Sequence, residues 1–149
     1  MGIVINQALD LSAQDIFEHL EISSNADFDD VPVMAGGPVQ TDHGFILHRN
    51  CDKQWEATLH VTPEISLTSS RDILRAIANG TGPKEHLIAL GYAGWEAGQL
   101  EFELAKNCWL TLPADSDIIF TTPYNLRLSA AAAVLGIDMN LISAQAGHA

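Results

Sequence analysis

A short apolar run passes directly into a glycine-rich turn in residues 86–110, HLIALGYAGWEAGQLEFELAKNCWL. The run from Leu87 to Leu90 contains no polar side chain, which is typical of a strand that is buried on both faces of a sheet. An acidic segment of helical pattern follows the glycines. A strand, a glycine turn and a helix in this order also occur in nucleotide-binding folds, so the turn has to be compared with the known phosphate-binding motifs.

The spacing of the glycines does not fit a phosphate-binding loop. A dinucleotide-binding turn needs G-x-G-x-x-G, and a Walker loop ends in G-K-[ST]. This turn reads G-x-x-G-x-x-x-G, and Gly98 is followed by Gln99. Glu96 would also put a carboxylate at the positive end of the helix, where an anion would bind. We therefore predict a packing turn, in which glycines with positive φ let Tyr92 and Trp95 fold over bare main chain.

The rest of the chain alternates between short strand patterns and helical patterns. Strands are predicted over residues 2–5, 31–34, 45–48, 56–61, 65–68, 87–90, 109–112 and 117–120. Helices are predicted over residues 13–20, between Ser70 and Gly80, over 97–106 with Leu100, Leu104 and Cys108 facing inward, and over 123–135 before Gly136. Ser12 and Asp15 fit a capping box for the first of these helices. We expect one mixed α/β or α+β domain.

The charge balance argues against several classes of partner. Seven Lys and Arg stand against nineteen Asp and Glu in 149 residues, for a net charge of −12. Nucleic acids and anionic membranes are bound through clustered basic residues, and here these are scattered. The residues at the start have no basic segment followed by a long apolar one, so we do not expect a secretory signal, and no apolar run reaches membrane-spanning length. Two distant cysteines, Cys51 and Cys108, suggest two buried or partly buried thiols in a reducing cytoplasm.

The polar residues give no recognised catalytic, cofactor or metal site. Asp42, His43, His48, Cys51 and His60 are close in sequence, but their spacing is not that of zinc ligands. No G-x-S-x-G motif is present. Glu101 lies among small residues on the predicted helix face and could admit a partner residue, although a solvated helix surface is the commoner role for such a side chain.

Several blocks together resemble the AlgH/YqgE family of bacterial proteins. They are AGGPVQTDHGFILH at 35–48, LGYAGWEAGQLEFELAKNCWL at 90–110, DIIF followed by TP, and the ending LGID…LIS…AGHA, with MGIVINQ at the start. The resemblance implies an α+β fold with a bent or split, mostly antiparallel sheet that forms a pseudo-barrel with flanking helices. No enzymatic activity is established for the family, so the resemblance supplies no catalytic residue, and one member is linked by name to transcriptional control of alginate production.

Members of that family carry some thirty or more residues before the block that begins here at Met1, so the resemblance implies either that translation begins at an earlier methionine or that this is a shortened form that lacks the family's N-terminal segment. Without such a segment, the strand at residues 2–5 would be an unpaired sheet edge that either pairs with a second copy of the chain or stays exposed.

We expect from this a cytoplasmic, non-enzymatic regulatory or interaction protein that binds protein rather than DNA and affects transcription indirectly. The alternative is a small-ligand-binding protein or enzyme that uses Asp42, His48 and Glu101. The candidate functional surface consists of Gly36, Gly37, Pro38, Asp42, His48, Tyr92, Trp95, Gln99 and Glu101.

Overall fold

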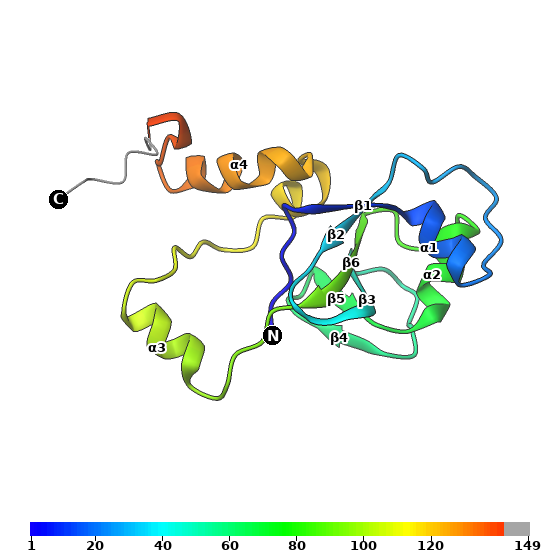
Figure 1. Cartoon of the computed structure of the whole chain (residues 1–149), viewed down its shortest axis with the longest axis horizontal. Coiled ribbons are helices and arrows are strands. Elements are labelled where there is room, and N and C mark those ends of the chain that lie inside the picture. Colours follow the sequence, from blue (N-terminus) through cyan, green and yellow to red (C-terminus); the bar gives the residue numbers. More distant parts are fainter. Residues whose placement is uncertain (142–149) are drawn as a thin grey trace.

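A six-stranded open sheet forms the centre of the protein in the computed structural model, which describes residues 1–141 (Figure 1). Its order is β1-β2-β6-β3-β5-β4, and only β2 and β6 pair in parallel. A mostly antiparallel sheet with separate helices confirms the α+β class. The edge strands β1 and β4 do not pair with each other, so the sheet does not close into the expected pseudo-barrel. The strands are β1 (Ala8–Ser12), β2 (Pro32–Ala35), β3 (Val39–Arg49), β4 (Thr58–His60), β5 (Ile65–Thr68) and β6 (His86–Tyr92).

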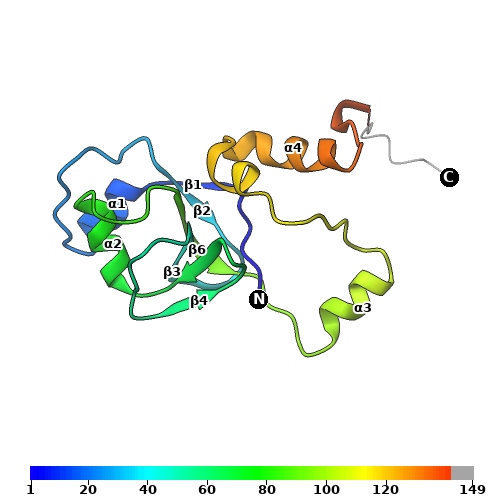
Figure 2. The same ribbon diagram turned by 180° about the vertical axis from the view of Figure 1, so that it is seen from behind.

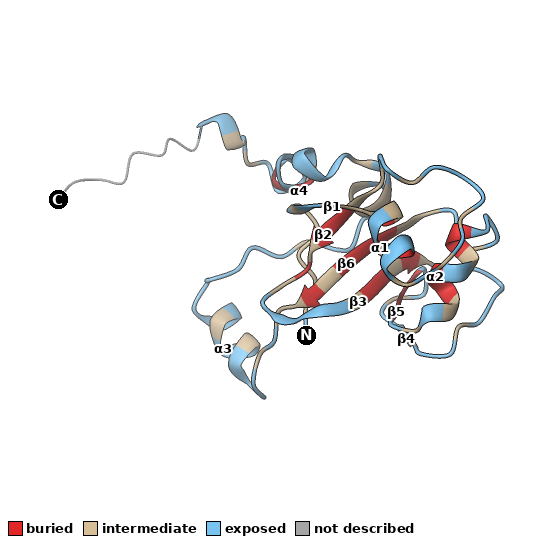
Figure 3. Cartoon of the chain, turned by 45° about the vertical axis from the view of Figure 1, so that its right-hand side comes forward, coloured by how far each residue is buried: buried red, intermediate tan, exposed pale blue. Residues whose placement is uncertain are grey.

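Two short helices, α1 (Ala13–His19) and α2 (Arg71–Ala78), cover one face of the sheet (Figures 1 and 2). The predicted capping box is present, since Asp15 N donates to Ser12 Oγ and Ser12 N donates to the Asp15 carboxylate. Phe17 of α1 and Ile73 of α2 are fully buried against Ile46 and Ile88 of the sheet. Buried residues therefore concentrate on the central strands and on the inner faces of these two helices (Figure 3).

The N-terminal segment lies against the opposite face of the sheet. Ile3 and Ile5 pack on Met34, Leu87 and Ala89 there. The predicted strand at residues 2–5 is wrong. The backbone of the segment forms one isolated bridge, between Gly2 and Ala93 just after β6, and Val4 N donates to the carbonyl of Gly36. These two separate contacts do not form a continuous β-ladder. The edge strand of the sheet next to β2 is β1.

The last third of the described chain is helical and irregular, and it lies beside the sheet without joining it. It contains α3 (Gln99–Ala105), a π-helical turn η1 (Asp117–Thr121), a 3₁₀ turn η2 (Tyr124–Leu126), α4 (Arg127–Val134) and a 3₁₀ turn η3 (Met139–Leu141). The strands predicted at 109–112 and 117–120 are both wrong. Asp115 explains the second error, because its Oδ1 accepts from the backbone of Asp117 and Ile118 at 2.9 and 3.1 Å and turns the chain into a helical conformation.

Arg127 connects this region to the sheet. Its guanidinium donates to the carbonyl oxygens of Ile5 and Thr122, and 9% of the residue is exposed. No helix among residues 1–141 is long and apolar enough to cross a membrane. Gly147 and His148, which match the family motif, lie outside the described residues.

Candidate functional site

Two glycine-containing segments cross at the ends of the parallel strands β2 and β6. One is Gly36 and Gly37, directly after β2, and the other contains Gly91, near the end of β6. Gly36 N donates to the carbonyl of Leu90 at 2.8 Å, so the two main chains are in direct contact. A Cβ on Gly91 would lie 2.3 Å from the carbonyl oxygen of Gly37, and Gly91 has a φ of +73°. A Cβ on Gly36 would lie 2.3 Å from the oxygen of Gly91. The prediction of a packing turn is confirmed at this crossing.

The other two glycines of the turn are not required by packing. A Cβ on Gly94 would meet Tyr92 Cε2 at an ordinary 3.6 Å, and no positive φ is needed there. Gly98 has a φ of +80° but has nothing within 4 Å of a Cβ. The two aromatic side chains differ from one another: the Tyr92 ring lies beside Gly94 of its own turn, as predicted, whereas the Trp95 ring does not. Tyr92 packs edge-to-face on Phe45, and the Trp95 ring covers Gly2 rather than its own turn.

Glu103 is the centre of a polar cluster that holds two tryptophans. Its carboxylate accepts from Trp95 Nε1 at 3.2 Å, from Trp109 Nε1 at 2.7 Å and from Gln99 Nε2 at 3.0 Å. The two indoles meet edge-to-face with centroids 5.8 Å apart. The hydrogen bond from Trp109, followed by that from Gln99, lowers the pKa of Glu103 below its ordinary value. We call this group, Trp95, Gln99, Glu103 and Trp109, the tryptophan clamp.

Sequence reasoning favoured Glu101 and missed Glu103. The sequence feature that points to Glu103 is its pairing with Gln99, four residues earlier on the same helix face. One tryptophan precedes this helix in the sequence and another follows it. Glu101 is exposed on the same helix.

The segment 93–116, here called the arm, stands away from the sheet in both views (Figures 1 and 2). Its helix α3 has no buried residue, so the expected inward face of Leu100, Leu104 and Cys108 is wrong. Phe102 is 63% exposed and Leu110 is 73% exposed. The cysteine expectation is wrong too, because Cys51 and Cys108 are both exposed.

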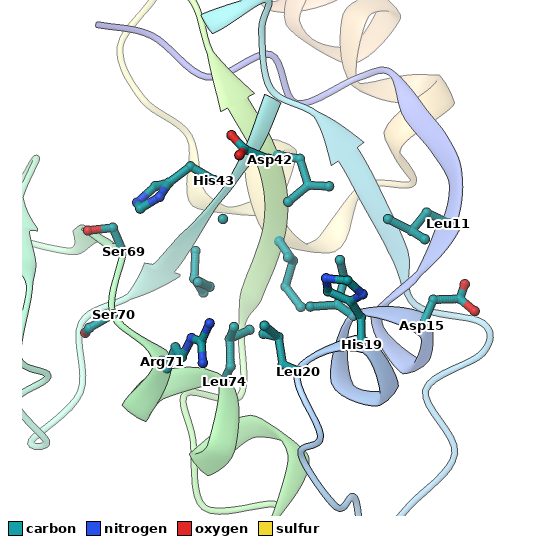
Figure 4. A pocket seen from close by; sticks show the side chains of 15 residues that line it. Leu11, Asp15, His19, Leu20, Asp42, His43, Ser69, Ser70, Arg71 and Leu74 are labelled. Atoms are coloured by element: carbon teal, nitrogen blue, oxygen red, sulfur yellow. The ribbon is translucent and has the colours of Figure 1, made fainter. Parts of the chain in front are cut away.

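A cavity of about 610 Å³ opens between α1, α2 and the helix-covered face of the sheet (Figure 4). Its floor is apolar, and its rim carries Asp42 from β3 together with other polar side chains. The lining residues are Leu11, Asp15, Ile16, His19, Leu20, Asp42, His43, Gly44, Ile46, Ser69, Ser70, Arg71, Leu74, Ile88 and Leu90. We call it the α1–α2 cavity.

A second cavity, of about 350 Å³, includes His48 in its lining. Both ring nitrogens of His48 are occupied, since Nδ1 lies 3.0 Å from the Arg49 carbonyl and Nε2 lies 2.9 Å from Thr68 Oγ1. Nδ1 is therefore the donor and Nε2 accepts from the threonine hydroxyl. Burial lowers the pKa of His48, which keeps the ring neutral. These contacts give His48 a structural role in the sheet.

The wall of the second cavity also holds a Ser66–His60 pair. His60 Nδ1 lies 2.8 Å from Ser66 Oγ, which donates to the side-chain oxygen of Asn50. Ser66 is 1% exposed, so its oxygen is not presented to a substrate. Among the residues that the structure describes, no group of three or more His, Cys, Asp or Glu side chains could hold a metal ion.

The structure separates the nine residues of the candidate functional surface. Gly36, Gly37 and Tyr92 meet at the glycine crossing. Pro38 follows that crossing on the exposed surface. Trp95 and Gln99 belong to the tryptophan clamp. Asp42 lines the α1–α2 cavity, His48 lines the other cavity, and Glu101 lines neither.

Comparison with known proteins gives consistent matches over nearly the whole chain. The model of a family described as AlgH-like matches residues 1–140. A UPF0301 protein of Saccharophagus degradans is 58% identical over 149 residues, which are all of this chain and 73% of that protein. A UPF0301 protein of Thioalkalivibrio sulfidiphilus is 54% identical, with 80% of its length covered. The solution structure of AlgH from Pseudomonas aeruginosa matches with a TM-score of 0.78 and 49% identity over all of this chain and 79% of that one.

Proposed function

Because this chain belongs to the AlgH-like family, we propose that it is a cytoplasmic, non-enzymatic regulatory protein that acts by binding another protein. Its influence on transcription is then indirect and passes through that partner. The net charge of −12 supports this route, because direct DNA binding depends on clustered basic residues.

The observation that carries the proposal is the exposed arm. An isolated helix of fewer than about 12–15 residues is marginal in water, and α3 spans only Gln99–Ala105. Within residues 1–141 it buries no residue, so apart from the contacts of the tryptophan clamp it has little packing to stabilise it. Phe102, Trp109 and Leu110 add exposed apolar surface in the same segment. Exposed apolar side chains gathered in this way are typical of a protein-binding surface.

The charges of the arm define the partner. The arm carries four carboxylates and a single ammonium group, on Glu96, Glu101, Glu103, Asp115 and Lys106. A complementary partner has an apolar groove bordered by Lys or Arg. Because Glu103 fixes both indoles of the clamp, the arm presents a partly ordered surface, which lowers the entropy lost on binding.

Affinity capture with the arm mutated tests the proposal. The double variant Phe102→Ser, Leu110→Ser removes the two most exposed apolar side chains of the arm. The matched control is Leu59→Ser, Val61→Ser, which removes two comparably exposed side chains in and just beyond β4. We expect a bound protein that is lost with the arm variant and retained with the control. Loss with both variants, or with neither, contradicts the proposal.

Two further measurements bear on the alternatives. Sequence-specific DNA binding by the purified protein at physiological salt would overturn the indirect route. Analytical ultracentrifugation checks for association of two copies, which stays a prediction. The expected contact through residues 2–5 loses its basis, since that segment is not a free edge strand.

The alternative function built on Asp42, His48 and Glu101 has weaker support. Asp42 and His48 line different cavities, and Glu101 is exposed on the arm. A shared reaction centre would need these groups within hydrogen-bond reach of a single substrate atom.

A further inference from the structure

The α1–α2 cavity has the shape and lining of a small-molecule site. Its volume of about 610 Å³ lies within the range of known ligand pockets. Part of its apolar lining comes from β3, α2, β6 and the residue that follows α1, namely Ile46, Leu74, Leu90 and Leu20. Figure 4 shows the polar side chains arranged around this lining. An apolar floor with a few polar groups at the rim suits an amphipathic ligand.

Gly44 provides an independent observation at the floor. It lies within β3, where a glycine weakens a strand by roughly 0.5–1 kcal/mol relative to alanine. Neither backbone conformation nor crowding requires glycine at this position, since its φ is not positive and a Cβ would meet no atom within 4 Å. Glycine inside a strand often marks a bulge or a place where a ligand approaches the backbone. The register of β3 against β6 shifts between Val39 and Gly44, and Gly44 also lines the α1–α2 cavity. Gly44 keeps this part of the cavity open.

The charged side chains at the rim of the α1–α2 cavity determine which polar group of a ligand could bind there. Arg71 is exposed at the start of α2, and within residues 1–141 its side chain makes no hydrogen bond or ion pair. His19 and His43 lie on the other sides of the opening (Figure 4). Two carboxylates also line the rim. Asp15 is engaged by Ser12 in the capping box, and Asp42 stands across the cavity from Arg71. A guanidinium without a partner is the strongest site for an anion here.

We propose that the α1–α2 cavity binds a small aliphatic carboxylic acid. The carboxylate pairs with Arg71, and the hydrocarbon chain lies along the floor above Gly44. This site is separate from the arm and does not depend on the proposed function. No reaction of the ligand is involved.

Titration of the full chain with butyrate, hexanoate and octanoate, followed by amide NMR shifts, tests the site. Each buried methylene contributes about 0.8 kcal/mol, so affinity should rise roughly fourfold per added carbon. The shifts should saturate and should map to Gly44, Ile46 and Leu74. An absence of saturable binding, or shifts confined to the arm, would overturn the proposal.

Three variants and one ligand analogue test separately the pairing of the carboxylate with Arg71 and the contact of the hydrocarbon chain with the floor. Arg71→Gln should weaken octanoate binding roughly tenfold by removing a charged hydrogen bond. Arg75→Gln is the matched control, because Arg75 is exposed on the same helix and does not line the cavity, so affinity should not change. Gly44→Val should abolish binding by filling the floor without lowering the melting temperature. Octanamide should bind weakly, with no sensitivity to Arg71→Gln. Equal losses in both arginine variants, or undiminished binding in the valine variant, would contradict the assignment.

Discussion

Substitution of the three glycines of the turn by alanine should give three different losses of stability. Gly91→Ala places a residue with a side chain at a φ of +73° and also brings a Cβ to 2.3 Å from the Gly37 oxygen. The left-handed conformation costs about 1–2 kcal/mol and the overpacking about 1–3 kcal/mol, for a loss of about 2–5 kcal/mol. Gly98→Ala, with a φ of +80° and open space around it, should lose only the first of these amounts. Gly94→Ala should be nearly neutral, because its Cβ makes only ordinary contacts.

Urea unfolding followed by circular dichroism measures all three free energies in the same protein. Since domains of this kind are stable by about 5–15 kcal/mol, the first variant should unfold at a clearly lower urea concentration. If Gly91→Ala costs no more than Gly98→Ala, close approach of the two turns is not what requires glycine at residue 91. A large loss in Gly94→Ala would show instead that the whole turn depends on backbone freedom.

Three further predictions concern polar contacts. The pKa of Glu103 is lowered in the folded state, so the tryptophan clamp is stable at pH values above the ordinary pKa of 4.5 and weakens as the pH falls below it. Tryptophan fluorescence should report this change with pH. The variant Glu103→Gln should abolish the pH dependence of the fluorescence. Burial lowers the pKa of both His48 and His86 below the ordinary value of 6.5. As the pH falls, these histidines are therefore protonated more readily in the unfolded chain than in the folded one. The free energy of unfolding should decrease when it is measured from about pH 7.5 down to about pH 5.5. Arg127→Met removes the hydrogen bond to the Ile5 carbonyl, which should cost about 1–3 kcal/mol and speed amide exchange in residues 2–7.

Local signals in the sequence predicted much of the regular structure. The Ser12–Asp15 pair defines the start of α1 because the contacts that make a capping box lie within four residues. The apolar run at residues 87–90 was recognised as a doubly buried strand, and β6 is indeed covered on both faces. Gly80 and Gly136 follow the ends of α2 and α4 with positive φ, as expected.

The errors fall where tertiary contacts decide the conformation. Residues 109–112 have a strand-like pattern but no neighbouring strand, and a β-pattern without a partner forms no ladder. The α3 helix was recognised, but its periodicity could not show that no core lies beneath it. The α1–α2 cavity brings together side chains from both helices and three strands, and no local motif records that convergence.

The parallel pairing of β2 with β6 also affects how the protein folds. Val33 pairs with Ile88, and β3, β4, β5 and α2 lie between these two strands in the sequence. Contacts between residues so far apart in the chain form slowly, because a long loop has to close first. We therefore expect the glycine crossing at the ends of these strands to be completed late in folding. Substitutions at the crossing should therefore accelerate unfolding while leaving the refolding rate nearly unchanged.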